Sequence, residues 1–344
     1  FICVYLSQDA FSVLKKLTTQ SILFFIFIFS LSIGLAFLFM QIITYRLRQL
    51  EQVAQAISTG NFEVQLPFQS QDEVGSLAAA MQTMASKIKD LVKDTIQKTR
   101  MESELKVARA VQENLLPEPY FQSQKLSGAG YYQPASECGG DLWYTFESGS
   151  SRFIAILDAT GHGAGPALVT SAVRAVFTLL ENEAEIKLTA VAEKLNRVID
   201  SVSKGQILMT AFLVRLDLNT GKGEYVNCSH EQPILLRENH EDLDYLSEPV
   251  NPRLGQDLKT QFEDGPFDLR SGDRLIFYTD GVTDIKNPAG KNFGDRRFLK
   301  IIQELHQKGL STEEFNKTLV QNLDHFSDAT ELPDDMTLIN ILSH

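Results

Sequence analysis

The sequence predicts an α+β domain at its C-terminal end, preceded by one membrane-spanning helix and a helical connecting segment. Three observations support this prediction. Residues 21–43 form an uncharged apolar run of about 23 residues, long enough to cross the ~30 Å hydrocarbon core of a bilayer. Apolar residues then recur in steps of three and four up to residue 115, as in packed helices. From about residue 120, glycines cluster and short β-type runs alternate with helical patterns.

The composition is that of a globular protein and excludes several function classes. With 344 residues, 43% of them hydrophobic and 22% charged, the chain has room for about two domains. The formal net charge of -12 argues against nucleic acid as a partner, because no basic surface is available to release phosphate counterions. Cys3, Cys138 and Cys228 are widely separated and odd in number, which disfavours a disulfide framework or a cysteine zinc site.

The first residues, Phe-Ile-Cys-Val-Tyr-Leu, look like the last strand of a truncated domain. We therefore expect a C-terminal fragment in which residues 1–20 end an extracytoplasmic sensor domain and 21–43 form the transmembrane helix. A signal peptide would have a shorter apolar region, and a buried soluble helix is disfavoured by the length and the phenylalanine content. The orientation stays open, since lysines at 15 and 16 balance arginines at 46 and 48.

Residues 44–98 contain two helical patterns joined by an extended connector. The first apolar stripe stops at Gly60-Asn61, and the second follows Asp72-Glu73-Val74-Gly75 with heptad-like spacing. The stripes comprise Leu47, Leu50, Val53 and Ile57, then Val74, Leu77, Met81, Met84, Ile88 and Leu91, with Phe62, Val64, Leu66 and Pro67 between them. This layout resembles a HAMP signalling module, although the proline usual near the start of the first helix is absent. The resemblance implies a cytoplasmic homodimeric four-helix bundle; any short coiled coil is the alternative.

Residues 99–119 are predicted to form a coiled-coil linker helix. The heptad register shifts between Thr95 and Met101, where a step of six residues stands in place of the seven or three that a heptad requires. Inserting three residues into a heptad has this effect. The shift indicates either local overwinding with two alternative packings or the ordinary end of a coiled coil. Pro117 and Pro119 end the helix because proline cannot continue it.

The remaining residues, 120–344, are predicted to form a layered α+β domain. Strands are expected at 126–132, 141–146, 152–158, 209–218, 224–227, 234–236, 274–279 and 336–342, and helices at 166–181, 189–202, 296–306 and 312–326. Ser311 or Thr312 can cap the last helix. The stretch 219–223 reads as a hairpin turn rather than a phosphate loop, because it lacks the spaced upstream glycine.

Four acids stand where predicted strands begin or end: Asp141, Asp158, Asp280 and Asp334. Taken alone, Asp158 is more simply a helix-capping residue before Gly161 and Pro166. Four such carboxylates on neighbouring strands would need divalent cations to offset their repulsion. Oxygen-only ligands favour Mg²⁺ or Mn²⁺ over zinc.

These elements resemble the metal-dependent PPM serine/threonine phosphatases of the RsbU/SpoIIE type over residues 105–344. The resemblance includes the helix 105–117, the stretch 269–284 and Phe293-Gly294. It implies a PPM phosphatase-like β-sandwich flanked by helices, and a hydrolase that removes phosphate from phosphoserine or phosphothreonine through a water activated by two metal ions. The substrate would be a STAS-domain anti-sigma-factor antagonist, and the enzyme would lie at the cytoplasmic face of the inner membrane.

The resemblance also implies site residues by position. Asp158 and Asp280 would be catalytic through the metal-bound water, and two ions, Mn²⁺ or Mg²⁺, would be held by Asp141, Asp158, the Ala159 carbonyl, Asp280 and Asp334. Tyr144 replaces a further acid that many relatives carry, which is expected to weaken one metal site. Asp273, Asp284, His162 and His230 are expected to form hydrogen bonds within turns or to the metal-binding residues, and not to bind metal directly. Because of Tyr144, the alternative is a catalytically weak scaffold that binds a signalling partner.

Overall fold

The computed structural model describes every residue except 1, 66–70, 162, 184–186, 239–242 and 329–330, with side chains described from residue 11 onward. The chain divides into two compact units, Phe1–Arg100 and Met101–His344, which are described separately.

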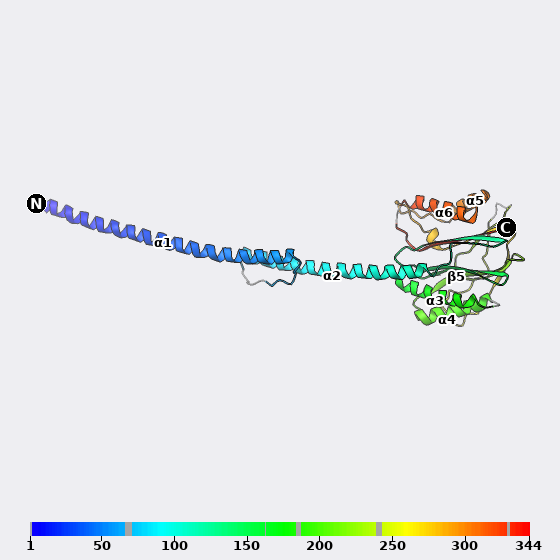
Figure 1. Ribbon diagram of the computed structural model, residues 1–344. Helices are drawn as coiled ribbons and strands as arrows, with labels where there is room; N and C mark the ends of the chain where they lie inside the picture. The colour runs from blue at the N-terminus through cyan, green and yellow to red at the C-terminus, as the bar shows by residue number, and fades with distance from the viewer. Residues whose placement is uncertain (1, 66–70, 162, 184–186, 239–242, 329–330) are drawn as a thin grey trace. The chain divides into compact units, whose positions relative to one another are not determined.

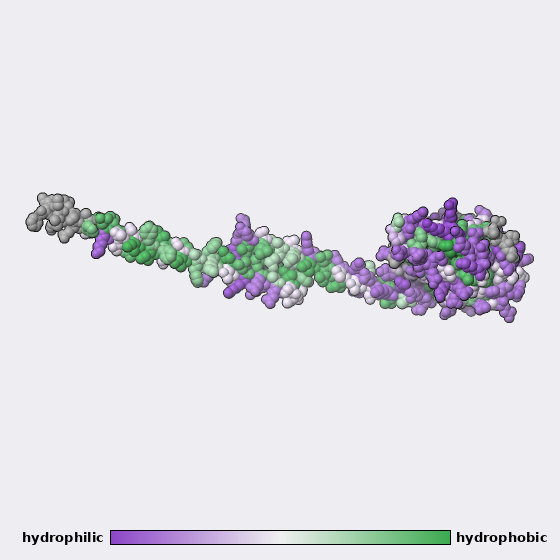
Figure 2. Space-filling model, turned by 90° about the horizontal axis from the view of Figure 1, so that it is seen from above, coloured by the Kyte–Doolittle hydropathy of each residue, from purple (hydrophilic) through white to green (hydrophobic). Residues whose placement is uncertain are grey.

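The first unit is built from helix α1 (Ile2–Ser58) and the first part of helix α2 (Glu73–Glu113). Among the described residues, one helix, Phe11–Ser58, is long and apolar enough to cross a membrane. Figure 2 shows the apolar surface along it. The strand expected at the start of the chain is wrong, because residues 2–6 continue α1 (Figure 1). A helix satisfies its own backbone, whereas a strand needs a neighbour to pair with.

The two helices of the first unit are joined as the sequence predicts. α1 ends at Ser58, and Gly60 adopts a positive φ of 90° that favours glycine. Asp72 caps α2, since its Oδ1 accepts a hydrogen bond of 2.9 Å from the Gly75 N–H. An ion pair of 3.0 Å joins Arg46 of α1 to Asp72. The connector is non-helical over 61–65, and the expected positions of Leu66 and Pro67 lie outside the described residues.

Helix α2 runs without interruption through the register shift at 95–101 and ends at Glu113, slightly before the predicted prolines. Its last turns, from Met101 onward, belong to the second compact unit. The helix therefore ends inside the unit that carries the acids.

In the second unit the described strands form two sheets packed face to face, with a pair of helices on each outer side (Figure 1). The six-stranded sheet has the order β1-β2-β11-β10-β7-β8, and the five-stranded sheet has the order β3-β4-β5-β6-β9. All neighbouring strands within the two sheets are antiparallel.

The elements of the unit have the following bounds. The strands are β1 (Tyr120–Gln122), β2 (Leu126–Gln133), β3 (Asp141–Ser148), β4 (Ser151–Ala159), β5 (Met209–Asp217), β6 (Lys222–Cys228), β7 (Ile234–Leu236), β8 (Leu243–Tyr245), β9 (Gly265–Asp268), β10 (Arg274–Tyr278) and β11 (Met336–Ser343). The helices are α3 (Ala164–Leu180), α4 (Leu188–Ser203), the short η1 (Asp280–Val282), α5 (Asp295–Gln307) and α6 (Thr312–Ser327).

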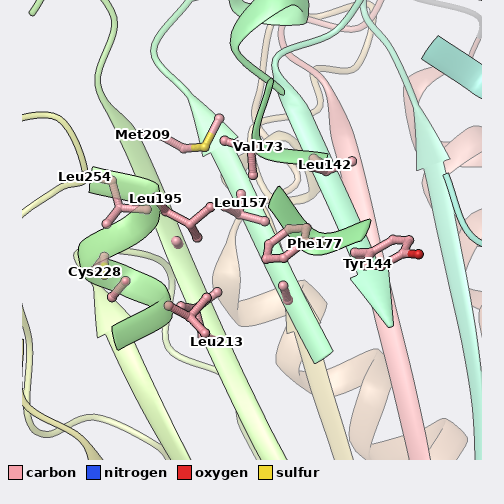
Figure 3. Packing of buried hydrophobic residues seen from close by; sticks show 14 of the residues in the cluster. Leu142, Tyr144, Leu157, Val173, Phe177, Leu195, Met209, Leu213, Cys228 and Leu254 are labelled. Atoms are coloured by element: carbon pink, nitrogen blue, oxygen red, sulfur yellow. The ribbon is translucent and has the colours of Figure 1, made fainter. Parts of the chain in front are cut away.

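Three apolar clusters hold these layers together. One, shown in Figure 3, lies between the five-stranded sheet and helices α3 and α4. A second fills the space between the sheets and includes Trp143, Phe212 and Phe277. The third lies between the six-stranded sheet and helices α5 and α6. The continuous apolar runs of β4, β5 and β10 follow from this arrangement, because each of these strands is buried on both faces.

Each strand and helix predicted for this unit is present, and Ser311 forms a capping box with Glu314 at the start of α6. The strands β1, β8 and β9 were not predicted. Each has at most four residues and lies at a sheet edge, so its sequence carries too little alternation to be recognised.

Candidate active site

The site begins with two acids that face each other across neighbouring strands. Asp141 is the first residue of β3 and Asp158 lies near the end of β4, and their Cα atoms are register partners. The alternative of Asp158 as a helix cap is wrong, because α3 begins at Ala164 with Gly163 at its N-cap position. The sheet therefore holds Asp158, and the glycine-rich turn follows it.

Asp141 connects the two sheets at this end. Its side chain is buried, and its Oδ2 accepts hydrogen bonds from the Thr279 hydroxyl at 2.9 Å and the Thr337 hydroxyl at 2.6 Å. Thr279 follows β10 and Thr337 lies in β11, both in the opposite sheet. Two hydroxyl donors leave the other carboxylate oxygen of Asp141 for a further partner.

The other two predicted acids come from the six-stranded sheet. Asp280 opens η1 with one residue between it and the end of β10, and Asp334 lies in the turn before β11. The neighbouring Asp335 is buried, and its carboxylate accepts hydrogen bonds from the backbone N–H groups of Ala135, at 2.7 Å, and Gly140. Asp335 therefore ties the turn before β11 to the turn before β3.

Two glycines permit this close approach. A Cβ atom on Gly281 would lie 1.9 Å from the backbone oxygen of Asp335, so only glycine fits beside this turn. A Cβ atom on Gly140 would lie 3.0 Å from the Ala159 oxygen and 2.9 Å from the Gly161 oxygen. The carbonyl of Ala159, predicted as a backbone ligand, is thus packed against the turn that carries Asp141.

The acids raise one another's pKa values. Burial, followed by the negative charges of Asp280 and Asp334, raises the pKa of Asp158 to about 7, although a hydrogen bond with Asp141 opposes the rise. Burial and the charge of Asp158 raise the pKa of Asp141 well above its usual range. Partial burial and Asp334 also raise the pKa of Asp280. The predicted acids are therefore close enough to repel one another strongly.

This donor set fits a hard divalent cation. It consists of carboxylate and carbonyl oxygens, the ligands that Mg²⁺ and Mn²⁺ prefer. Among the described residues, no three His, Cys, Asp or Glu side chains form a complete ready-made ligand cluster. Magnesium is commonly bound through one or two carboxylates and several waters. A magnesium site therefore does not require three protein ligands in contact with one ion.

Tyr144 points away from this site. Successive strand residues face opposite sides, and Asp141 faces the other sheet while Tyr144 lies in the cluster beneath α3 (Figure 3). The Tyr144 ring stacks on Phe177, with centroids 5.6 Å apart, and its hydroxyl donates to the Glu181 carboxylate. An acid at position 144 would point into the helix-covered side, so its replacement takes no group from the face that carries Asp141.

Of the other candidate residues, His230 and Asp284 lie near the site, whereas Asp273 does not. His230 is buried, with its Nδ1 2.8 Å from the hydroxyl of Thr210, and burial lowers its pKa to about 4. Asp284 accepts a hydrogen bond from Asn292 beside the acids. Asp273 pairs with Arg237 at 2.7 Å at the start of β10, the opposite end from Asp280. His162 lies outside the described residues.

The sequence reasoning did not assign roles to Asp335, Thr279 and Thr337. The sequence offered a signal for each of them. Thr279 directly precedes Asp280, Asp335 directly follows Asp334, and Thr337 lies two residues after Asp335. Their contacts with Asp141 and Gly140 cross from one sheet to the other, and no spacing along the chain predicts such contacts.

Two stacked antiparallel sheets flanked by helix pairs, with acids from both sheets meeting at one end, define the class of the PPM-type serine/threonine phosphatases. The chain belongs to the family of stage II sporulation protein E (SpoIIE), whose family model matches residues 148–342. A HAMP domain model matches residues 38–90.

Curated relatives and solved structures agree with this assignment. The chain is 27% identical over 239 residues to the phosphoserine phosphatase RsbU of Bacillus subtilis, and the matched region covers 70% of each protein. It is 24% identical over 328 residues to the protein IcfG of Synechocystis, covering 87% of this chain and 51% of IcfG. The chain thus spans about half the length of IcfG. The SiaA-PP2C domain of Pseudomonas aeruginosa has the same fold, with a TM-score of 0.60, 20% identity and coverage of 71% of this chain and 97% of that domain.

Proposed function

We propose that the protein is a metal-dependent phosphatase that hydrolyses phosphoserine or phosphothreonine on a protein. The observation that carries this proposal is the convergence of Asp141, Asp158, Asp280 and Asp334 from two sheets on one another. A set of carboxylates that repel one another at neutral pH is costly to fold unless a cation offsets the charge. The relation to RsbU supports the same reaction class.

The chain's own residues prepare the site in three ways. Thr279 and Thr337 orient Asp141 across the gap between the sheets. Asp335 fixes the Gly140 turn, and the glycine at 281 lets the Asp334–Asp335 turn approach. Asp158, Asp280, Asp334 and the Ala159 carbonyl would then hold the ions together with Asp141. Such pre-positioning avoids reorganisation during the reaction.

When bound, two divalent cations, Mn²⁺ or Mg²⁺, would lower the pKa of water and neutralise the phosphoryl oxygens. No protein nucleophile is required for such chemistry. In agreement, Cys228 is fully buried and burial raises the pKa of its thiol, so it is unsuited to attack a phosphoryl group.

The substrate is proposed to be a phosphorylated regulatory protein, specifically a STAS-domain anti-sigma-factor antagonist. The support is the relation to RsbU and to the SpoIIE family. The exposed rim beside the acids, including Gly161 and Asp280, is where a phosphopeptide would meet the site.

We further propose that the protein is anchored in the cytoplasmic membrane and acts as a homodimer. The domains would be a transmembrane helix at 21–43, HAMP at 44–98, a coiled-coil linker at 99–119 and the phosphatase domain at 120–344. In the first unit the buried positions of α2 are the small Ala78 and Ala85, while Leu77, Met84 and Leu91 are 51%, 48% and 66% exposed. These large side chains form a stripe that a second copy would cover.

The reaction is tested by measuring phosphate release from phosphoserine and phosphothreonine proteins with and without Mn²⁺. We expect metal-dependent release that Asp158→Asn and Asp280→Asn abolish. The control is Asp217→Asn, a half-buried acid at the end of β5 whose Oδ1 accepts hydrogen bonds from the backbone N–H groups of Asn219 and Thr220, away from the acids of the site. An unaltered rate in both site variants would refute the proposal.

The rival function is a scaffold that binds a signalling partner without hydrolysis. It predicts partner binding that is unaffected by metal and by Asp280→Asn, with no phosphate released. The position of Tyr144 on the other face of β3 weighs against this rival, because it leaves the group of four acids intact.

A further inference from the structure

In the last turn of α2, the side chain of Gln112 hydrogen-bonds the turn that leads into Asp141. This side chain is only 7% exposed. Its Nε2 donates to the Gly139 carbonyl at 2.7 Å, and its Oε1 accepts from the Gly139 N–H at 3.1 Å. Nε2 also donates to the Thr170 hydroxyl of α3 at 3.2 Å. A side-chain amide paired in both directions with one residue fixes the position and the orientation of that residue's backbone.

The residue after Gly139 belongs to the acidic site. The Gly140 N–H donates to the Asp335 carboxylate, and the Gly140 carbonyl accepts from the Ala159 N–H at 3.2 Å. There is no room for a Cβ atom on Gly140 between the carbonyls of Ala159 and Gly161. A displacement of Gly139 would therefore move Asp141 and the Ala159 carbonyl relative to each other.

The end of α2 and the residues just after it make two further contacts within the same unit. The thiol of Cys138 lies 3.7 Å from the Leu105 carbonyl as a weak donor. Arg174 of α3 donates from Nε to the Leu115 carbonyl at 2.8 Å. Gln112 is distinct from these contacts because it alone of the three bonds both backbone groups of the residue that leads into the Asp141 turn.

We propose that Gln112 is a positioning residue of the phosphatase site: its amide holds the Gly139–Gly140 turn so that Asp141 and the Ala159 carbonyl lie where a divalent cation binds. The placement of the last turn of α2 thereby sets the cation affinity of the site. This inference rests on the proposed function. An amide is required because it donates and accepts at once; leucine would do neither, and glutamate would accept but bring a negative charge to the Gly139 carbonyl.

The test uses the complete 344-residue chain in detergent and measures Mn²⁺ binding without substrate, by electron paramagnetic resonance of the free ion. Hydrogen exchange of the peptide covering 138–141 is measured in parallel. Gln112→Leu and Gln112→Glu are compared with Glu113→Gln, which changes an exposed residue of the same turn. They are also compared with Thr170→Val, which removes the longest of the three Gln112 bonds and the bond from the Thr170 hydroxyl to the Ala167 carbonyl, and leaves both bonds to Gly139 in place.

We expect Gln112→Leu to weaken Mn²⁺ binding by about 10- to 100-fold, as is typical when a partner that orients metal ligands is removed. Exchange should rise at 138–141 and stay unchanged elsewhere in the unit. Gln112→Glu should fall between Gln112→Leu and the wild type, because it keeps the bond from the Gly139 N–H. Both controls should stay within about twofold of the wild type.

Two results would overturn the inference. One is a wild-type protein that binds Mn²⁺ and a Gln112→Leu variant that binds it equally well. The other is a rise in exchange throughout the unit for both Gln112 variants, which would show a general stabilising role. Failure of the proposed function is a separate outcome, in which the wild type neither binds Mn²⁺ nor releases phosphate.

Discussion

Replacement of Asp158 by asparagine should stabilise the metal-free protein while it removes the proposed activity. Burial and the charges of Asp280 and Asp334 raise the pKa of Asp158 from 3.8 to about 7. At 1.36 kcal/mol for each pKa unit, ionisation of this carboxyl in the folded protein costs up to about 4 kcal/mol. Because Asp158 titrates together with the neighbouring acids, only part of this cost is removed with Asp158. We therefore expect the free energy of unfolding of Asp158→Asn to exceed that of the wild type by about 1 to 3 kcal/mol.

The sign follows from proton binding. Between pH 3.8 and about 7 the folded protein holds a proton on Asp158 that the unfolded chain has already released. The contribution of Asp158 to stability is therefore fully present below its unfolded pKa and is lost as the pH rises through the folded value. The difference between the variant and the wild type should be large at pH 8 and small near pH 4.

The assay is urea unfolding of residues 101–344 in EDTA at both pH values, followed by circular dichroism. Asp217→Asn is the control of opposite sign. Hydrogen bonds from Thr220 and Asn219 lower the pKa of Asp217, so its removal should destabilise the protein at pH 8. An Asp158→Asn protein that is less stable than the wild type at pH 8, or a difference independent of pH, would refute the repulsion argument.

Three further predictions concern the same unit. The affinity for Mn²⁺ should rise with pH through about 7, the pKa of Asp158, and calorimetry in buffers of different ionisation enthalpy should detect protons released on binding. Gly281→Ala should reduce phosphate release at least 100-fold, because its Cβ would lie 1.9 Å from the Asp335 backbone oxygen, whereas Gly165→Ala, which meets only a side chain at 3.6 Å, should stay near the wild-type rate. Removal of residues 101–119 should lower the melting temperature, since it deletes buried hydrogen bonds of Gln112; equal melting temperatures would contradict this role for the helix.

Much of the architecture was readable from the sequence because local signals agree with the final fold. The apolar run within 152–158 predicted a strand, and Ser311 or Thr312 was expected to cap the last helix, which Ser311 does. The short edge strands β1, β8 and β9 were missed because their three or four residues show no usable period. The N-terminal strand was predicted wrongly because apolar β-branched residues are common to strands and to apolar helices.

The sequence by itself determined which acids stand at strand ends, since Asp141, Asp158, Asp280 and Asp334 each adjoin an apolar run or a turn signal. Only the tertiary structure decided which groups meet. Register pairing sets Asp141 opposite Asp158, and sheet packing brings Thr279 and Thr337 to Asp141. The tertiary structure also places Tyr144 on the helix-covered side of β3 and brings Gln112 to Gly139. The physical reason is that hydrogen bonds between distant segments depend on how the layers pack, and the order of residues along one strand or helix does not encode that packing.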